Sequence, residues 1–208
     1  AMEGPDNVPC EDEDLFVSSK DYNGPTSFAQ KISVAASLIY SRESMRKFQA
    51  LCERVRPDIV HMNLVHRQIT LSILDAPYLK THHVPVLFTS HDYILVCPSY
   101  VMLDGSGNVC DACLGGKFSS CLKRKCVKGS LAKSAMGTLE AEHLKLCKTY
   151  RKIDRIIAPS EFMRQKLIEG GFPARQVVYM QNFAKQEILN IASRGSDRTD
   201  RDDPYLLF

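Results

Sequence analysis

The sequence predicts an α/β fold in which a parallel sheet is flanked by helices and carries a cysteine-rich loop insertion. Three observations support this prediction. Short apolar segments typical of strands alternate with segments whose apolar residues recur at helical spacing. Polar side chains follow each strand segment, and five of the eight cysteines lie within residues 97–126. Alternating strands and helices favour parallel pairing with right-handed crossovers.

Composition is that of an ordinary globular protein. The chain has 208 residues, of which 44% are apolar and 25% are charged. It contains no apolar run of about 18 residues, and its start lacks the basic and apolar parts of a secretion signal. We therefore expect the reducing cytosol, where clustered cysteines bind metal or stay as thiols. A net charge of +3 is too small to indicate a nucleic-acid partner.

The first half of the chain begins with an irregular segment over residues 1–25, which is rich in Pro, Gly and Asp. Helical spacing of apolar residues then runs over residues 27–55. Ser41 is expected to cap the second of two helices there, and Pro57 to end it. A short strand is predicted over residues 58–61.

The second half continues the alternation. Gly residues punctuate the segment after the second strand and are expected to form turns there. Helix, strand, helix, strand, helix and strand are predicted in that order over residues 67–80, 85–90, 130–153, 155–158, 160–169 and 177–180.

Polar residues at the strand ends predict a ligand crevice, because the carboxyl ends of parallel strands share one edge of the sheet. Some of these residues have an equally good structural interpretation. Ser160 would cap a helix, Asp92 would cap a turn, and His61 would pack in the core. The candidate binding residues are His61, Asn63, Asp92, Tyr93, Ser160 and Asn182.

His91 is the candidate catalytic residue. It follows an apolar strand directly, and its two distinct ring nitrogens suit hydrogen bonding to a sugar hydroxyl or proton transfer. The alternative is a buried histidine bonded to the backbone. The sequence has neither a Gly-x-Ser-x-Gly motif nor a phosphate-binding glycine loop.

The cysteine spacing predicts a structural zinc site. Cys110, Cys113, Cys121 and Cys126 can supply four thiolates to a tetrahedral ion, and Cys97 could replace one of them. Metal-free thiols and disulfides are the alternatives. Zinc would hold together a loop with few apolar residues. Two further cysteines, Cys52 and Cys147, are expected in the core because they lie on apolar helix faces.

Basic residues surround these cysteines, with Lys123, Arg124 and Lys125 at the centre. They form either a solvated surface or a contact for a phosphate-bearing ligand or a membrane. Nucleic acid is disfavoured because Phe118 is the sole aromatic residue near them.

Several motifs resemble those of the family 4 glycosyltransferases. The likeness runs from about residue 28 to residue 184. It is carried, in the expected order, by RPDIVH (56–61), PVLFTSHDYILVCP (85–98), KGSLAKSA (128–135), DRIIAPSEFMRQKL (154–167) and QNF (181–183). The resemblance implies the GT-B fold, in which two Rossmann-like domains face a cleft. The amino-terminal domain receives the acceptor and the carboxy-terminal domain holds the nucleotide-sugar donor.

By this resemblance, residues 1–192 form the amino-terminal Rossmann-like domain without its first strand, and residues 97–128 are an insertion within it. Residues 193–208 would be a linker and the start of a carboxy-terminal domain, so the chain would be truncated at both ends. His91 would lie beside the reacting sugar, and Ser160 and Asn182 near the domain hinge. Ala184 replaces an Asp that is frequent in the family, which weakens the hinge role.

The resemblance implies an enzyme that transfers a sugar, with retention, to a glycan or lipid-linked sugar acceptor. The cysteine insertion resembles a subgroup that acts in cell-surface polysaccharide synthesis, which places the enzyme in the cytoplasm, with contact at the inner face of the membrane. No catalytic metal is expected, and the fragment alone is expected to be inactive. The rival functions are a non-catalytic α/β binding module with a zinc-stapled loop and a nucleotide-sugar epimerase.

Overall fold

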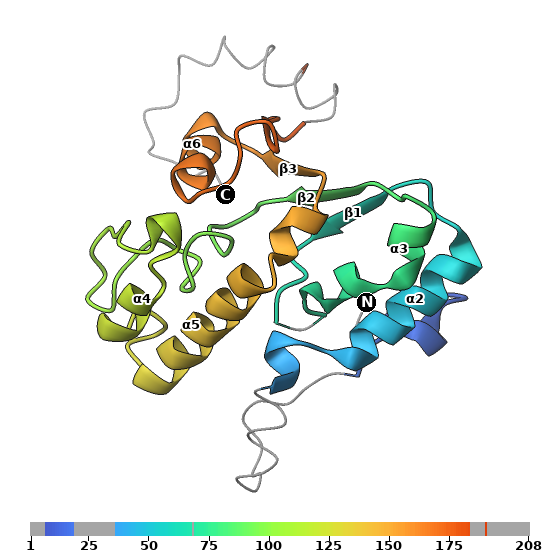
Figure 1. Ribbon diagram of the computed structural model, residues 1–208, viewed down its shortest axis with the longest axis horizontal. Helices are drawn as coiled ribbons and strands as arrows, with labels where there is room; N and C mark the ends of the chain where they lie inside the picture. Colours follow the sequence, from blue (N-terminus) through green and yellow to red (C-terminus); the bar gives the residue numbers. More distant parts are fainter. Residues whose placement is uncertain (1–6, 19–35, 68, 184–189, 191–208) are drawn as a thin grey trace, which may run out of the picture.

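A four-stranded parallel sheet forms the centre of the protein, in the order β1-β2-β3-β4. The computed structural model describes residues 7–18, 36–67, 69–183 and 190. In Figure 1, helix α6 lies on one side of the sheet and helices α2, α3 and α5 lie on the other. The predicted α/β class with a parallel sheet is therefore confirmed. The bounds are β1 Val60–Asn63, β2 Val86–Thr89, β3 Arg155–Ala158, β4 Val177–Tyr179, α2 Arg42–Val55, α3 Pro77–Thr81, α5 Leu131–Leu146 and α6 Glu161–Glu169.

A row of four apolar side chains crosses the sheet and is buried along its whole length. Met62 pairs with Phe88, Phe88 with Ile156, and Ile156 with Val177. Each of the four is at most 3% exposed. Burial of such side chains is worth about 1.5–3 kcal/mol each relative to exposure, so this row fixes the register of the strands.

Local signals predicted four elements well. Helix α2 begins after Ser41, whose hydroxyl accepts a hydrogen bond from Ser44 N at 3.2 Å, and it ends before Pro57. Strand β3 has the predicted bounds, and β2 lies inside its predicted range. Helix α6 is capped by Ser160 and ends at Gly170, after which Gly171 adopts a φ of 106°.

The first strand lies two residues later than predicted. Pairing with β2 starts at Val60, and Ile59 before it is 52% exposed. The strand continues through the buried Met62, so Asn63 ends it and His61 lies within it. The apolar pattern alone did not show which of these residues faces the core.

Two predicted helices are wrong in extent. The segment 67–80 contains the 3-10 helix η2 (Leu71–Asp75) and the short helix α3 instead of one helix. Thr70, with a φ of 68°, precedes the first, and Pro77 begins the second because it has no N–H to donate. Helix α5 ends at Leu146 instead of continuing to residue 153, and the 3-10 helix η4 (Thr149–Lys152) follows it.

Other predicted segments fall largely outside the described residues. The helix expected before residue 41 is described over residues 36–39, and its earlier part is not. The predicted linker and strand start over residues 193–208 also lie outside the described residues.

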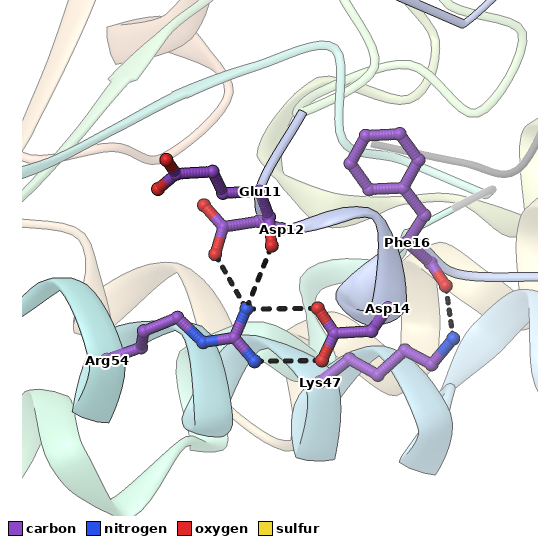
Figure 2. Close-up of polar contacts among 6 residues, drawn as sticks. All are labelled: Glu11, Asp12, Asp14, Phe16, Lys47 and Arg54. Carbon is purple, nitrogen blue, oxygen red and sulfur yellow. Dashed lines mark hydrogen bonds and ion pairs between the residues drawn. The ribbon is translucent and has the colours of Figure 1, made fainter. Parts of the chain in front are cut away.

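The acidic segment near the amino end is bound to helix α2 (Figure 2). It contains the 3-10 helix η1 (Glu13–Leu15). The Arg54 guanidinium donates to a carboxylate oxygen of Asp12 at 2.9 Å and to both carboxylate oxygens of Asp14 at 3.0 and 2.8 Å. These contacts lower the pKa of the Asp14 carboxyl. Lys47 donates to the Phe16 carbonyl, so the segment is anchored at both ends.

The cysteine-rich insertion has a small hydrophobic core of its own, which the sequence did not lead us to expect. It includes the 3-10 helix η3 (Leu114–Gly116) and helix α4 (Ser119–Lys123). Phe118 and Val127 pack with two thiols and with a residue of α5, and the whole cluster comprises Cys113, Phe118, Cys121, Val127 and Ala141. Figure 1 shows α4 beside α5, so the insertion is supported by that helix.

Within the part of the chain that the structure describes, no helix has the length and apolar composition that a membrane crossing requires.

The contact between the end of α6 and the loop after β2 can be tested at Gly170. A Cβ there would lie 2.2 Å from Cγ1 of Val96, which is 1% exposed. Gly170→Ala should therefore lower the free energy of unfolding by about 1–3 kcal/mol in urea titrations, through overpacking. Adding Val96→Ala should remove the contact with Cγ1 and leave only the one with Cβ of residue 96, at 2.9 Å, so the double variant should be more stable than the two single losses predict. Additive losses would contradict this packing.

Candidate functional site

A cavity of about 260 Å³ opens at the carboxyl ends of β1 and β2. Its lining includes Thr89 at the end of β2 and the loop residues that follow both strands. The polar side chains that line it are His66, Arg67, Thr89, His91, Asp92 and Tyr100. We call this cavity the crevice. It lies at the sheet edge where parallel α/β proteins bind ligands.

His91 and Asn63 meet at the rim of the crevice. His91 Nε2 lies 2.9 Å from Asn63 Oδ1. Because an amide oxygen can only accept, the histidine donates from Nε2, which leaves Nδ1 of the neutral ring as an acceptor. Register explains the contact, since Asn63 pairs with Thr89, two residues before His91.

Asp92 lines the crevice and also stabilises the turn after β2. Its Oδ1 accepts a hydrogen bond from Ile94 N at 2.9 Å, and its carbonyl accepts one from the buried Ser90 hydroxyl at 2.8 Å. Tyr93 does not line the crevice. Its ring packs edge-on against Phe162, with centroids 6.4 Å apart.

His61 faces a different cavity. Its Nε2 lies 2.7 Å from Thr89 Oγ1, and with Asn63 it lines a space of about 340 Å³ beside α2. His61 is exposed, so the alternative of a core histidine is wrong.

Ser160 and Asn182 lie away from the crevice. Ser160 Oγ accepts a hydrogen bond from Met163 N at 3.1 Å and thereby caps α6. Asn182 is exposed after β4. Neighbouring strands are about 4.8 Å apart, so the end of β4 lies roughly 10 Å from the end of β2. The structure therefore brings together His91, Asn63 and Asp92 but not the residues that follow β3 and β4.

Arg67 and Tyr100 complete the crevice, and sequence reasoning missed both. Arg67 Nε lies 3.5 Å from a carboxylate oxygen of Glu140, Nη2 donates to the Pro98 carbonyl at 3.1 Å, and the guanidinium carbon lies 5.6 Å from the Tyr100 ring centroid. Leu64, Arg67 and Tyr100 have φ values of 49°, 68° and 60°. Strained backbone of this kind concentrates at functional sites. For Arg67, the one signal in the sequence was that no good N-cap residue precedes it, which argues against a helix that starts there. No such signal marked Tyr100.

His66 forms the floor of the crevice. Its ring contacts Phe88 edge-on, with centroids 5.7 Å apart, and its Nε2 is buried without a hydrogen-bond partner among the described residues. Burial, with a smaller contribution from the Arg67 charge, lowers the pKa of His66 to about 3. The ring is therefore neutral at physiological pH. Burial also raises the pKa of Glu140, against the opposing effect of Arg67.

All eight cysteines are free thiols. Cys113 and Cys121 are buried, whereas Cys110 Sγ lies 3.5 Å from a guanidinium nitrogen of Arg124. Over the described ranges, no three His, Cys, Asp or Glu side chains are grouped so that they could hold a metal ion. Disulfides were one alternative that the cysteine spacing left open, and the structure contains none because all eight cysteines are free. Cys52 lies in the core as expected, but the same expectation for Cys147 is wrong because it is exposed after α5.

Comparison with known proteins adds one finding. The model of the family described as Glycosyltransferase Family 4 matches residues 8–185. No curated protein and no solved structure gives a match. The matched residues include the whole crevice and the cysteine-rich insertion.

Thiol reactivity tests the burial of the cysteines. Burial, followed by the charges of neighbouring thiols, raises the pKa of Cys113 and of Cys126 to about 12. At pH 8 only about one in 10⁴ of such thiols is the reactive thiolate. A disulfide reagent should therefore modify the exposed Cys10 and Cys147 first. All eight should react in guanidinium chloride, and rapid modification of Cys113 in the native protein would contradict the structure.

Proposed function

Because the chain belongs to glycosyltransferase family 4, we propose that it is the acceptor-binding domain of a retaining glycosyltransferase. The enzyme would transfer a sugar from a nucleotide-sugar to a glycan or lipid-linked sugar acceptor in cell-surface polysaccharide synthesis. One observation carries the proposal. His91 and Asp92 line a crevice at the sheet edge together with Arg67 and Tyr100, and Asn63 at its rim is hydrogen-bonded to His91.

The chemistry of the crevice suits a sugar. A sugar presents hydroxyl groups that donate and accept, together with apolar C–H faces. His91 Nδ1 and the Asp92 carboxylate offer acceptors, Arg67 offers donors, and the Tyr100 ring offers an apolar surface. The hydrogen bond to Asn63 holds His91 in one tautomer and orientation, so that Nδ1 is ready to accept from a hydroxyl of the reacting sugar.

The proposed division of labour leaves the departing diphosphate to another domain. Family members use nucleotide-sugar donors. In this proposal a carboxy-terminal domain binds the nucleotide, while the present chain orients the sugar and the acceptor. The 208-residue chain by itself should then show no transferase turnover.

We also propose a cytoplasmic location with peripheral membrane contact. Free thiols throughout the chain suit a reducing compartment. The insertion and the start of α5 carry exposed basic residues, which favour an anionic lipid surface. They are Lys117, Lys123, Arg124, Lys125, Lys128 and Lys133.

Replacement of His91 tests the catalytic part of the proposal. In an enzyme that contains this chain and its donor-binding domain, His91→Ala should lower kcat by about 100-fold, the usual cost of one hydrogen bond that stabilises the transition state. His83→Asn is the matched control, because His83 lies before β2 at the opposite end of the strand and Asn tolerates its φ of 52°. Equal kcat values for the two variants would remove His91 from the mechanism. Ligand binding without turnover in any full-length form would favour the binding module instead.

Structural zinc, held by Cys110, Cys113, Cys121 and Cys126 or with Cys97 in place of one of them, stays a prediction. In the described residues these thiols are not grouped as a metal site, so zinc binding would have to bring them together. In that case elemental analysis should find about one zinc per chain. Cys113→Ser should lower that content, whereas Cys10→Ser should not. Zinc-free protein whose unfolding temperature is unchanged by added zinc would contradict a structural role.

A further inference from the structure

A second cavity, of about 310 Å³, adjoins the crevice on the side of helix α5. Its walls come from the helical residues 36–39, from the end of the insertion and from the amino-terminal half of α5. Arg67 lines both cavities, so its guanidinium lies at their boundary. Gly137 of α5 faces Pro98 there, and a Cβ at this position would lie 3.3 Å from the Pro98 carbonyl oxygen.

The second cavity is positively charged. It is lined by the cations Arg67, Lys128 and Lys133 and by one carboxylate, Glu140. Neither lysine ammonium has an acidic partner within the described part of the chain. Arg67 Nε is paired with Glu140 and Nη2 donates to the Pro98 carbonyl, so Nη1 keeps its donors for a ligand. Three cations against one carboxylate leave an excess of two positive charges.

The same cavity has an apolar wall. Leu38 and Ile39 from the helical residues 36–39 and Met136 from α5 supply it. A cavity that combines clustered cations with aliphatic and thioether side chains matches an amphiphile, a phosphate group joined to a hydrocarbon chain. A free phosphate would leave the apolar wall uncovered, and a plain glycan would leave the cations unpaired.

We propose that this cavity binds the phosphate groups and the first part of the hydrocarbon chain of a lipid-diphosphate-linked acceptor, whose sugar occupies the crevice beside His91. The proposal rests on the proposed function and specifies its acceptor. Arg67 joins the two parts because it touches both cavities. Its contacts with Glu140 and Pro98 hold the guanidinium in place before the acceptor arrives.

The structure separates Lys128 and Lys133 from the basic residues at the centre of the insertion. Lys123, Arg124 and Lys125 line neither cavity. The Arg124 carbonyl instead accepts a hydrogen bond from Gly105 N at 3.1 Å, and its side chain lies against Cys110. The pair Lys128 and Lys133 and the pair Lys123 and Lys125 therefore differ in their access to the cavity while carrying the same charge.

Calorimetric titration of the full chain tests the proposal with three probes. They are farnesyl diphosphate, inorganic pyrophosphate, and vesicles of phosphatidylglycerol in phosphatidylcholine. Farnesyl diphosphate should bind at least about tenfold more tightly than pyrophosphate, because its chain covers the apolar wall. Lys128→Glu with Lys133→Glu should weaken that binding by at least about tenfold. The matched pair Lys123→Glu with Lys125→Glu makes the same change in net charge and should have little effect.

Three outcomes would overturn the proposal. Equal losses in the two lysine pairs would mean that general charge attraction, and not the cavity, binds the probe. Equal affinity for pyrophosphate and farnesyl diphosphate would remove the hydrocarbon chain from recognition. Vesicle binding that depends on Lys128 and Lys133, without farnesyl diphosphate binding, would assign the cavity to a membrane headgroup. The titration needs no turnover, so its failure leaves the transferase test at His91 unaffected.

Discussion

The buried row of Met62, Phe88, Ile156 and Val177 is the constraint on which the rest of the structure depends. A slip of one residue in any strand would turn its core side chain to the other face, so the row locks all four strands in register. The register places Asn63 opposite Thr89, and the chain then brings His91 back over Asn63. The crevice is thus a consequence of how the core packs.

A second set of contacts connects the sheet edge to the long helix. Glu140 is buried on α5, and its carboxylate holds the Arg67 guanidinium between the crevice and the adjoining cavity. A buried carboxylate without a partner would be costly, so each charge fixes the position of the other. Arg67 has a positive φ, which is unfavourable for a residue with a side chain. The contacts of its guanidinium with Glu140, the Pro98 carbonyl and the Tyr100 ring offset that cost. Strain and polar contacts therefore coincide at the proposed acceptor site.

Prediction succeeded where the signal was local and failed where it was not. Ser41 and Ser160 indicated helix starts correctly, because each hydroxyl accepts a hydrogen bond from a backbone N–H only three residues later. The end of α5 had no such mark. There Lys148 adopts a left-handed conformation, and the Gln176 amide donates to the carbonyls of Tyr150 and Ile153 at 2.8 and 2.7 Å. That partner lies far along the chain, so periodicity alone extended the helix too far.

The sequence by itself determined the parallel α/β architecture, the polar strand ends and the position of His91 after β2, because apolar periodicity and chain order are enough to specify them. Only the tertiary structure decided that Asn63 is hydrogen-bonded to His91, that Ser160 and Asn182 lie elsewhere, and that Arg67 lines the crevice. It also decided that the thiols of the insertion pack in a small core. The physical reason is that these outcomes are side-chain contacts between distant segments, and they exist only after the buried row has set the register.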